Sequence, residues 1–530
     1  MYVVIVDTTQ IQPYIFGSNR LKENIGASYL VAQATTNWAE SCLPTEMEKL
    51  YAGGGNFVAL AEAEGAAKAF VRALSQKVLL EAPGLQLVMT YRERGDKESL
   101  ATAVTQTFAQ LAQQKQARAH KEPLLGLSVT QMCRSTALPA VIQDEEERPF
   151  SPAIWAKLEV NQLATKRLTE DLKPSSGSSY PRDFDDLGRE KGEQSHIAIV
   201  HADGNGMGQK FIALNQAYAN NLDDAGYKEA IRALSENVNK AGLTALQATV
   251  DALQNRIAHD EPARKDAIRQ RNAKGDMIAE VMLKQEKGTT YLPFRPLVFG
   301  GDDVTFVCDG RLGISLAIEY LEQFETQTRK IFGETFTACA GIAIVKSHYP
   351  FARAYGLAEE LCGKAKNYRV QNGLDGSCLD WHFAFTGLAG DIGEIRRREY
   401  TTYQDHNTLS DENYKGEHLT LRPLTLNGNP KDSHRSFSVV EKGIKAFQDL
   451  DKDKDPQWST RRNKVKALRE ALREGPDAVR RFITMYGLKE LLPDLGTGDF
   501  QSTGWWGNYC GYFDAIEMMD WYIPLKEQQA

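Results

Sequence analysis

The stretch Gly300-Gly301-Asp302-Asp303 lies between two apolar segments, residues 293–299 and 304–307, that we predict to be β-strands. The two glycines supply the positive φ angles that a two-residue hairpin requires. A hairpin needs only one good turn pair, so folding alone does not explain a second acidic residue directly before the apolar strand. Adjacent carboxylates repel each other unless a divalent cation lies between them and a phosphate. The turn is therefore either a plain hairpin or a cation site.

A second acidic residue follows a strand about a hundred residues upstream. The apolar run at residues 197–202 ends in Asp203, a glycine-rich loop follows, and a helical pattern begins near Lys210. Such a loop can be a simple tight turn, or its backbone N–H groups can bind a triphosphate. The loop residues are Gly204, Asn205, Gly206, Met207 and Gly208. Together, Asp203, Asp302 and Asp303 predict a site for one or two Mg²⁺ (or Mn²⁺) ions that activates a 3′-hydroxyl and stabilises the leaving pyrophosphate.

A lysine is predicted to belong to the same site. After the hairpin we predict a helix at residues 311–331, a strand at 336–345 and a helix at 349–366. Lys366, on the last turn of that helix, could reach nucleotide phosphates. The alternative is a cation that only interacts favourably with the C-terminus of its helix.

These motifs carry a family resemblance. Together with Ala340-Gly341-Ile342-Ala343 and Tyr349-Pro350-Phe351, they resemble the palm-type nucleotidyl cyclases. Within these, the chain is most similar to the large polymerase-like subunit of type III CRISPR effector complexes, because residues 11–30 and 51–57 match that family better than they match diguanylate cyclases. The resemblance covers roughly residues 1–425 and is least specific over the C-terminal hundred residues.

An internal repeat supports the resemblance. Residues 2–7 form an apolar strand that ends in Asp7, as residues 197–203 end in Asp203, and Gly53-Gly54-Gly55-Asn56 takes the place of the acidic hairpin. We therefore predict an α+β fold of two ferredoxin-like palm domains with a C-terminal helical domain. Asn56 cannot neutralise a divalent ion as a carboxylate does, so the first palm should bind but not catalyse.

The resemblance also implies site residues. In the family, a degenerate palm faces the active palm across a composite pocket that holds two nucleotides. Ser28 is carried over as a contact to the nucleotide of the first palm; alternatively, it only caps or packs in a helix. Gly300, Gly301, Lys366 and the five loop residues are carried over as nucleotide-binding, and Asp203, Asp302 and Asp303 as catalytic metal ligands.

Composition limits the class of protein. The chain has 530 residues, of which 42% are hydrophobic and 25% charged, as in ordinary soluble proteins. We expect a cytoplasmic protein without membrane contact, because no signal peptide and no apolar run near the ~18 residues of a bilayer span is present. The seven cysteines form no CxxC pair, which argues against a zinc ribbon. The net charge of −7 argues against non-specific coating of nucleic acid.

We expect four segments. Residues 1–145 form the degenerate palm, 146–195 a connector, 196–395 the active palm with a helical insertion, and 396–530 a helical domain. The pattern at residues 461–480 predicts an amphipathic helix with Val465, Leu468 and Leu472 on one side. Its basic face is either solvated or contacts RNA or a partner subunit. Many members of the resembled family begin with an HD nuclease domain, which we do not expect here.

The favoured function is a nucleotidyltransferase that joins NTPs, above all ATP, into a cyclic oligonucleotide signal in antiviral defence. It would work with RNA-guided effector subunits and target RNA, or as a stand-alone relative. One alternative is a diguanylate-cyclase-like GTP cyclase, against which the duplicated palm and Asp303-Val304, in place of the usual acid–Phe pair, both count. The other alternative is a non-catalytic scaffold subunit of an effector complex, which gives no reason for two adjoining carboxylates.

Overall fold

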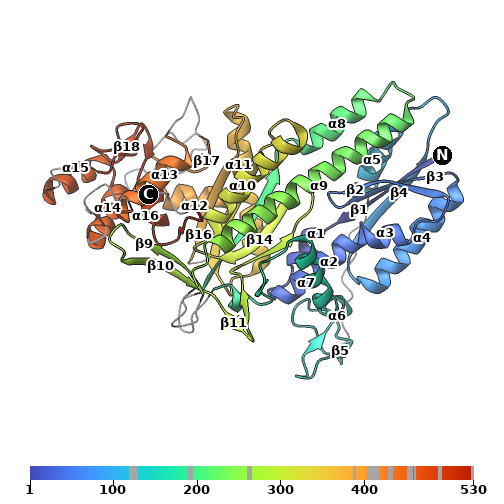
Figure 1. The fold of residues 1–530 in the computed structure, drawn as a ribbon, viewed down its shortest axis with the longest axis horizontal. Helices are drawn as coiled ribbons and strands as arrows, with labels where there is room; N and C mark the ends of the chain where they lie inside the picture. The colour runs from blue at the N-terminus through green and yellow to red at the C-terminus, as the bar shows by residue number, and fades with distance from the viewer. Residues whose placement is uncertain are drawn as a thin grey trace.

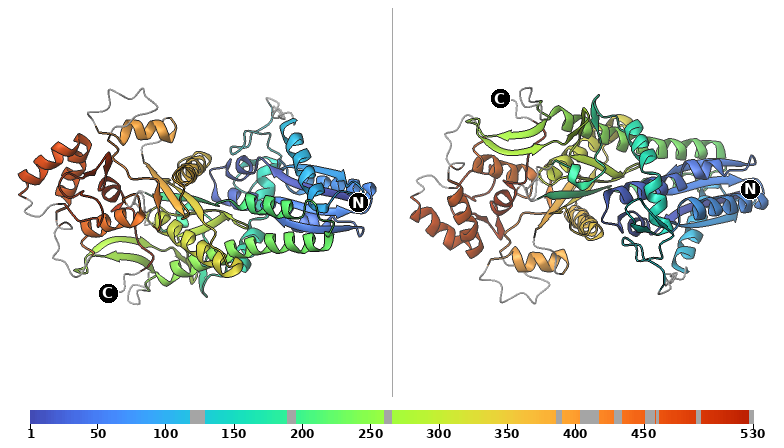
Figure 2. Two further views of the ribbon diagram at one scale, coloured as in Figure 1. Left: turned by 90° about the horizontal axis from the view of Figure 1, so that it is seen from above. Right: turned by 90° about the horizontal axis from the view of Figure 1, so that it is seen from below.

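The protein is elongated, with the first palm at one end, the C-terminal domain at the other and the second palm between them (Figures 1 and 2). This arrangement is seen in a computed structural model. It describes residues 1–117, 129–188, 195–259, 266–385, 390–402, 417–427, 434–450, 458, 461–487 and 492–526.

The first palm is built on a four-stranded antiparallel sheet in the order β2-β3-β1-β4. Its strands are β1 (Tyr2–Thr9), β2 (Met47–Gly53), β3 (Asn56–Ala61) and β4 (Gln86–Glu93). The helices of this half are α1 (Ile11–Phe16), α2 (Leu21–Ala34), α3 (Asn37–Ser41), α4 (Glu64–Glu81) and α5 (Leu100–Ala117).

The second palm repeats this order and extends it by two strands, as β13-β14-β8-β15-β16-β17. Only the β15–β16 pair is parallel. The strands are β8 (His196–Gly204), β13 (Phe294–Val298), β14 (Asp303–Asp309), β15 (Ala338–Lys346), β16 (Cys378–Ala384) and β17 (Leu424–Thr425), and two helices cross the sheet, α10 (Gly313–Phe332) and α11 (Phe351–Gln371). The predicted duplication of a palm is therefore confirmed, since the hairpin strands, the first strand and the strand after the next helix share one order in both halves.

A long insertion separates β8 from its hairpin, and it is helical, as predicted, up to Asn255. It contains the short α8 (Met207–Ala217) and the 32-residue α9 (Asp224–Asn255), which begins over the first palm and runs back to the second (Figure 1). Small strands follow before β13: β9 (Ala267–Arg271), β10 (Met277–Met282), β11 (Gln285–Glu286) and β12 (Thr289–Tyr291).

The connector between the palms is mainly helical. It holds α6 (Pro152–Glu159) and α7 (Asn161–Asp171), a 3₁₀ turn (Phe184–Asp186), and three two-residue strands, β5 (Ile142–Gln143), β6 (Pro149–Phe150) and β7 (Ser178–Ser179). Both helices pack against α2 of the first palm, so the connector buttresses that domain.

The C-terminal domain is largely helical, and it does not separate cleanly at residue 396, because β17 returns to the edge of the second palm sheet and pairs with β16. The apolar face predicted within residues 461–480 is confirmed, since α14 (Arg462–Glu474) buries Val465, Leu468 and Leu472. The single helix predicted there is wrong, because α14 ends before Gly475. The remaining elements are α12 (Ile392–Glu399), α13 (Phe437–Phe447), α15 (Pro476–Met485), β18 (Trp505–Trp506), β19 (Tyr509–Cys510) and α16 (Phe513–Met518).

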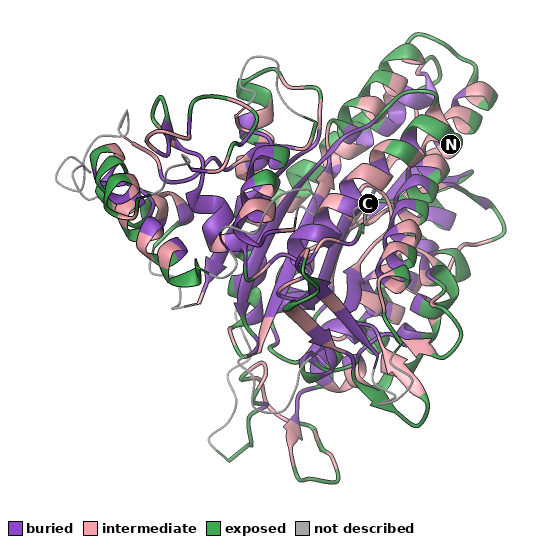
Figure 3. Ribbon diagram, turned by 60° about the vertical axis from the view of Figure 1, so that its left-hand side comes forward, coloured by how far each residue is buried: buried purple, intermediate pink, exposed green. Residues whose placement is uncertain are grey.

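The sheet of the second palm is buried on both faces (Figure 3). Alternate residues point to opposite faces of a strand. On one face Ala198 and Val200 pack with α9, α10 and the C-terminal domain. On the other face Ile197 and Ile199 pack with α11 and with α1 and α2 of the first palm. The acidic hairpin thus belongs to a rigid double-layered core. Among the described residues, no helix combines the length and apolar character that a membrane span requires.

Candidate functional site

The three predicted carboxylates come together at one end of the second palm sheet. Asp203 is directly paired with Asp303 across the antiparallel β8–β14 ladder. Asp302 precedes β14 in the turn, and its carbonyl oxygen accepts a hydrogen bond from the N–H of Gly204 at 3.1 Å. The hairpin and the glycine loop after β8 are therefore joined through the backbone beside the acids.

Glycines allow this close approach. Gly300 and Gly301 have φ angles of 119° and 84°, positive as predicted. The two-residue hairpin is wrong, however, because β13 ends at Val298 and β14 begins at Asp303. A Cβ atom on Gly204 would lie 2.7 Å from Cβ of Asp302, so a side chain there would displace that acid. The predicted roles of Gly300 and Gly301 in the hairpin are thus seen in the backbone, while their contact with a nucleotide stays a prediction.

The acids are held in an environment that disfavours their charge. Burial, together with the charge of Asp203, raises the pKa of Asp302 to about 6. Burial and Asp203 likewise raise the pKa of Asp303 to about 7. The side chain of Asp303 is 48% exposed as a whole, but its Oδ1 atom is buried and has no hydrogen-bond partner. One oxygen of Asp303 therefore faces protein while the other remains accessible.

His201 lies beside this orphaned oxygen. Its Nδ1 atom is 3.4 Å from Oδ1 of Asp303 and 3.2 Å from Oγ1 of Thr305. The ring is 7% exposed, and burial lowers the pKa of His201, so the imidazole is neutral at pH 7. His201 is thus a packed histidine beside the acids, and a neutral ring adds no charge to the site.

Lys366 reaches the acids from α11. Its ammonium group donates a hydrogen bond to Oδ2 of Asp203. Burial alone would lower the pKa of Lys366, but this bond and the charge of Asp203 raise it above the ordinary value. The prediction that Lys366 stands on the last helical turn is wrong, because α11 continues to Gln371. An interaction with the helix end therefore does not explain Lys366.

The glycine loop offers three free backbone donors. The N–H groups of Gly204 and Asn205 are used by the carbonyls of Asp302 and Thr337, so these two cannot donate to a phosphate. The side-chain amide of Asn205 donates to Oγ1 of Thr337 at 3.0 Å. Gly206 caps α8, and the N–H groups of Gly206, Met207 and Gly208 donate to no described residue. Free N–H groups at the start of a helix favour an anion.

The donor set suits a hard divalent cation, although the site is not assembled around one. Carboxylate oxygens are the ligands that Mg²⁺ and Mn²⁺ prefer, and the side chain of Asp303, 48% exposed, keeps one oxygen accessible. Within the described part of the chain, no three His, Cys, Asp or Glu side chains already stand in metal-binding geometry. In this structure, Oδ2 of Asp203 is paired with Lys366 instead.

The first palm contains a counterpart of this pair that we did not predict. Asp7 is paired with Asn56 across β1 and β3, as Asp203 is with Asp303. Lys115 of α5 donates to Oδ2 of Asp7, as Lys366 of α11 does to Asp203. Aligning the two halves of the sequence helix by helix would have found Lys115.

Ser28, another predicted nucleotide contact, is also bonded to protein. Its hydroxyl donates a hydrogen bond to the carbonyl of Leu297 in β13, and it is partly buried. Ser28 and Phe299 line the same small cavity, next to the acidic turn. Ser28 thus links α2 to the hairpin, and its contact with a nucleotide stays a prediction.

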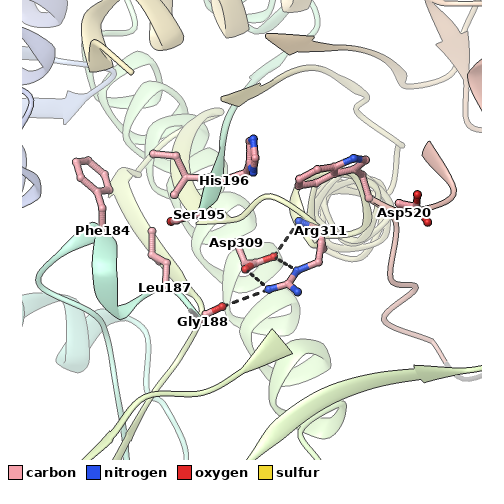
Figure 4. A pocket seen from close by; sticks show the side chains of 10 residues that line it. Phe184, Leu187, Gly188, Ser195, His196, Asp309, Arg311 and Asp520 are labelled. Carbon is pink, nitrogen blue, oxygen red and sulfur yellow. Dashed lines mark hydrogen bonds and ion pairs between the residues drawn. The ribbon is translucent and has the colours of Figure 1, made fainter. Parts of the chain in front are cut away.

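A larger cavity, of about 290 Å³, lies at the start of β8, at the opposite end of the strand from Asp203 (Figure 4). Two of its charged side chains form an ion pair. The guanidinium of Arg311 donates to both carboxylate oxygens of Asp309 at 2.9 Å and also to the carbonyl of Gly188. His196 makes edge contacts with Phe385 and Trp521. This cavity therefore adds no group to the acidic site.

Part of the sequence and the overall fold are similar to those of known proteins. Residues 196–375 match the second palm domain of the Cas10/Cmr2 family. No curated protein matches the sequence. The fold resembles that of a chain in the Csm1–Csm4 cassette in complex with cA4, with 13% identity, a TM-score of 0.53, and coverage of 98% of this chain and 69% of that chain.

Two further structures of the same cassette show the same fold. The complex with pppApA has 13% identity and a TM-score of 0.51, and the complex with pppApApA has 12% identity and a TM-score of 0.50. Both cover 98% of this chain and 69% of theirs. The chain is thus Cas10-like, and its residues 196–375 form a second palm domain of the Cas10/Cmr2 family.

Proposed function

We propose that this chain is a nucleotidyltransferase that joins ATP molecules into a cyclic oligoadenylate. The observation that carries the proposal is the pairing of Asp203 with Asp303 at adjoining strand ends, with Asp302 in the turn beside them. Burial and the charge of Asp203 raise the pKa values of Asp302 and Asp303, and packing alone gives no reason for this cost. Such strained clusters are typical of functional sites.

Each part of the site has a task in this reaction. Asp203, Asp302 and Asp303 would hold Mg²⁺ or Mn²⁺. The bound cation supplies Lewis-acid charge that acidifies a 3′-hydroxyl and offsets the charge of the leaving pyrophosphate. The free N–H groups of Gly206, Met207 and Gly208 would bind the triphosphate at the start of α8. Lys366, released from Asp203, would neutralise a phosphate.

The similar structures support the choice of substrate. They are cassettes in complex with cA4, pppApA and pppApApA, each of which contains adenosine. We propose ATP as the substrate here on that likeness, and a Csm4-like partner subunit on the same ground. Activation by target RNA within a type III CRISPR effector complex belongs to the same proposal.

The test is to incubate the chain, alone and with its effector complex, with Mg²⁺ or Mn²⁺ and each NTP in turn. Mass spectrometry should show a cyclic oligoadenylate from ATP. The variant with Asp302→Asn and Asp303→Asn should make none, whereas Asp375→Asn, at an exposed aspartate of the same palm, should not change the yield. Product from the double variant would refute the assignment.

The alternatives give different results in the same experiment. A cyclic dinucleotide made only from GTP would indicate a diguanylate cyclase. A chain that binds no ATP by calorimetry, with or without Mn²⁺ and its partners, would be a scaffold subunit. The duplication of palms within one chain already counts against the first of these.

A further inference from the structure

The insertion helix α9 contacts the hairpins of both palms with one face. Towards its N-terminus, Nε of Arg232 donates to the carbonyl of Leu50 at 3.0 Å, and Oγ of Ser235 donates to the carbonyl of Ala52 at 3.2 Å. Both acceptors belong to β2, the strand that leads into the glycine turn of the first palm. This half of α9 is therefore fixed to the degenerate hairpin.

The next turns of α9 hold the acidic hairpin. Oδ1 of Asn239 accepts a hydrogen bond from the N–H of Gly301 at 3.1 Å. One turn further on, a Cβ atom on Gly242 would overlap the carbonyl oxygen of Gly301, so only glycine lets the turn rest on the helix. Ser235, Asn239 and Gly242 are spaced at four and three residues and thus lie on one helical face.

The two turns also lie close to each other. The backbone nitrogen of Gly54 is 3.9 Å from the position that a Cβ atom on Gly301 would take. Because the same face of α9 contacts both β2 and Gly301, this helix fixes the position of the two hairpins relative to each other. We propose that Asn239 is a positioning residue, which fixes the acidic turn against the first palm so that two nucleotides can meet between them.

Stability does not account for an asparagine at this position. Asn239 is exposed, and its bond to Gly301 is the only hydrogen bond of its side chain to the described residues. Asparagine in a helix interior is also less favourable than alanine. Because Gly301 donates to the amide oxygen, the amide NH₂ group is fixed as the free end of the side chain. The inference rests on the proposed function for its purpose, but the contact it describes can be measured without any reaction.

The measurement is hydrogen–deuterium exchange of the peptide that contains Gly301, on the full chain. In Asn239→Ala, exchange at the turn should be about five to ten times faster, the effect of losing one hydrogen bond. Asn239→Asp keeps the acceptor and should restore most of the protection. Asn237→Ala is the matched control, because Asn237 stands on the same helix and its side chain forms no hydrogen bond to the described residues.

Activity then tests the purpose of the contact. If the chain makes product, Asn239→Ala should lower kcat about tenfold or more, because small misplacements of reacting groups are costly, and should leave the Kd for ATP unchanged. An unchanged exchange rate at the turn in Asn239→Ala would overturn the inference, and so would an equal loss in Asn237→Ala. If no variant and no wild-type sample makes product, the proposed function fails, while the exchange experiment still decides the role of Asn239.

Discussion

Lys366 forms an ion pair with Asp203, the carboxylate that ends the first strand of the second palm. A divalent cation that took Oδ2 of Asp203 would displace this ammonium group. Under the proposed function, the displaced lysine would then be available to a phosphate, and cation binding would be linked to substrate binding.

Replacing Lys366 should separate these two effects. In Lys366→Met, Asp203 loses its competitor, so we expect Mn²⁺ to bind at least as tightly as in the wild type. Turnover should fall about a hundredfold, because one charged contact to a phosphate in the reacting complex is lost. Calorimetry with Mn²⁺ and product analysis measure the two quantities.

The matched control is Lys364→Met. Lys364 lies on the same helix, but its Nζ atom is 3.8 Å from Oε1 of Glu360 and it is not paired with Asp203. Its loss should therefore change neither the Mn²⁺ affinity nor the turnover. Weaker Mn²⁺ binding in Lys366→Met would contradict the competition. Normal turnover in that variant would remove Lys366 from the site.

The raised pKa values of Asp302 and Asp303 predict a pH dependence of stability. Their folded-state pKa values, about 6 and about 7, are above the ordinary 3.8. The stabilising contribution of such a group is complete below the ordinary pKa and is lost as the pH rises through the folded pKa. Without divalent cations, these two acids should therefore make the protein less stable at pH 8 than at pH 5.5.

Thermal unfolding in EDTA tests this sign. The variant with Asp302→Asn and Asp303→Asn should unfold at a higher Tm than the wild type at pH 8, by about 2–4 °C for each kcal/mol relieved, and the gain should shrink at pH 5.5. Added Mn²⁺ should raise the Tm of the wild type alone. A gain in Tm of equal size at both pH values would mean that the pKa values of the two acids are not raised in the folded state.

The sequence was sufficient for the acidic turn and its partner strand. Positive φ at Gly300 and Gly301 is dictated locally by turn chemistry, and the alternation of apolar residues places Asp203 at a strand end. Both signals depend only on neighbours in the chain. Lys366 was also predicted from its neighbours in the chain. The C-terminal end of its helix, α11, was not predicted correctly.

Contacts between distant segments could not be predicted in this way. Asn239 belongs to an insertion, and nothing in its local pattern indicates that Gly301 lies beside it. The return of β17 to the sheet depends on two residues that carry no strand signal of their own. Ser28 was found through the family resemblance, and its bond to Leu297 depends on how two domains pack.

Gly208 gives a prediction about the triphosphate loop. A Cβ atom there meets no protein atom within 4 Å, and Gly208 lies in the first turn of α8. Gly208→Ala should therefore keep or slightly raise the Tm, since alanine is the better helix former by about 1 kcal/mol. Binding of ATP should weaken about tenfold if the open space beside Gly208 is where the phosphates lie.

The control for Gly208 is Gly356→Ala. Gly356 is a helical glycine of α11 with the same open surroundings, so alanine there should raise the Tm without changing the Kd for ATP. Calorimetry with a non-hydrolysable ATP analogue measures the affinity. Equal affinities in wild type and Gly208→Ala would place the triphosphate elsewhere.

The pair of Lys115 and Asp7 predicts that the first palm binds a nucleotide but does not need a cation to do so. Asn56 stands where Asp303 stands in the second palm, so the first palm keeps one lysine and one carboxylate without the second acid. In Lys115→Met, calorimetry should show one of two bound ATP molecules lost, and the Mn²⁺ affinity should not change. The exposed Lys68, paired with Glu64 on α4, offers the control Lys68→Met. If Lys115→Met instead abolished Mn²⁺ binding, the two palms would share one metal site, and the division into a binding palm and a reacting palm would be wrong.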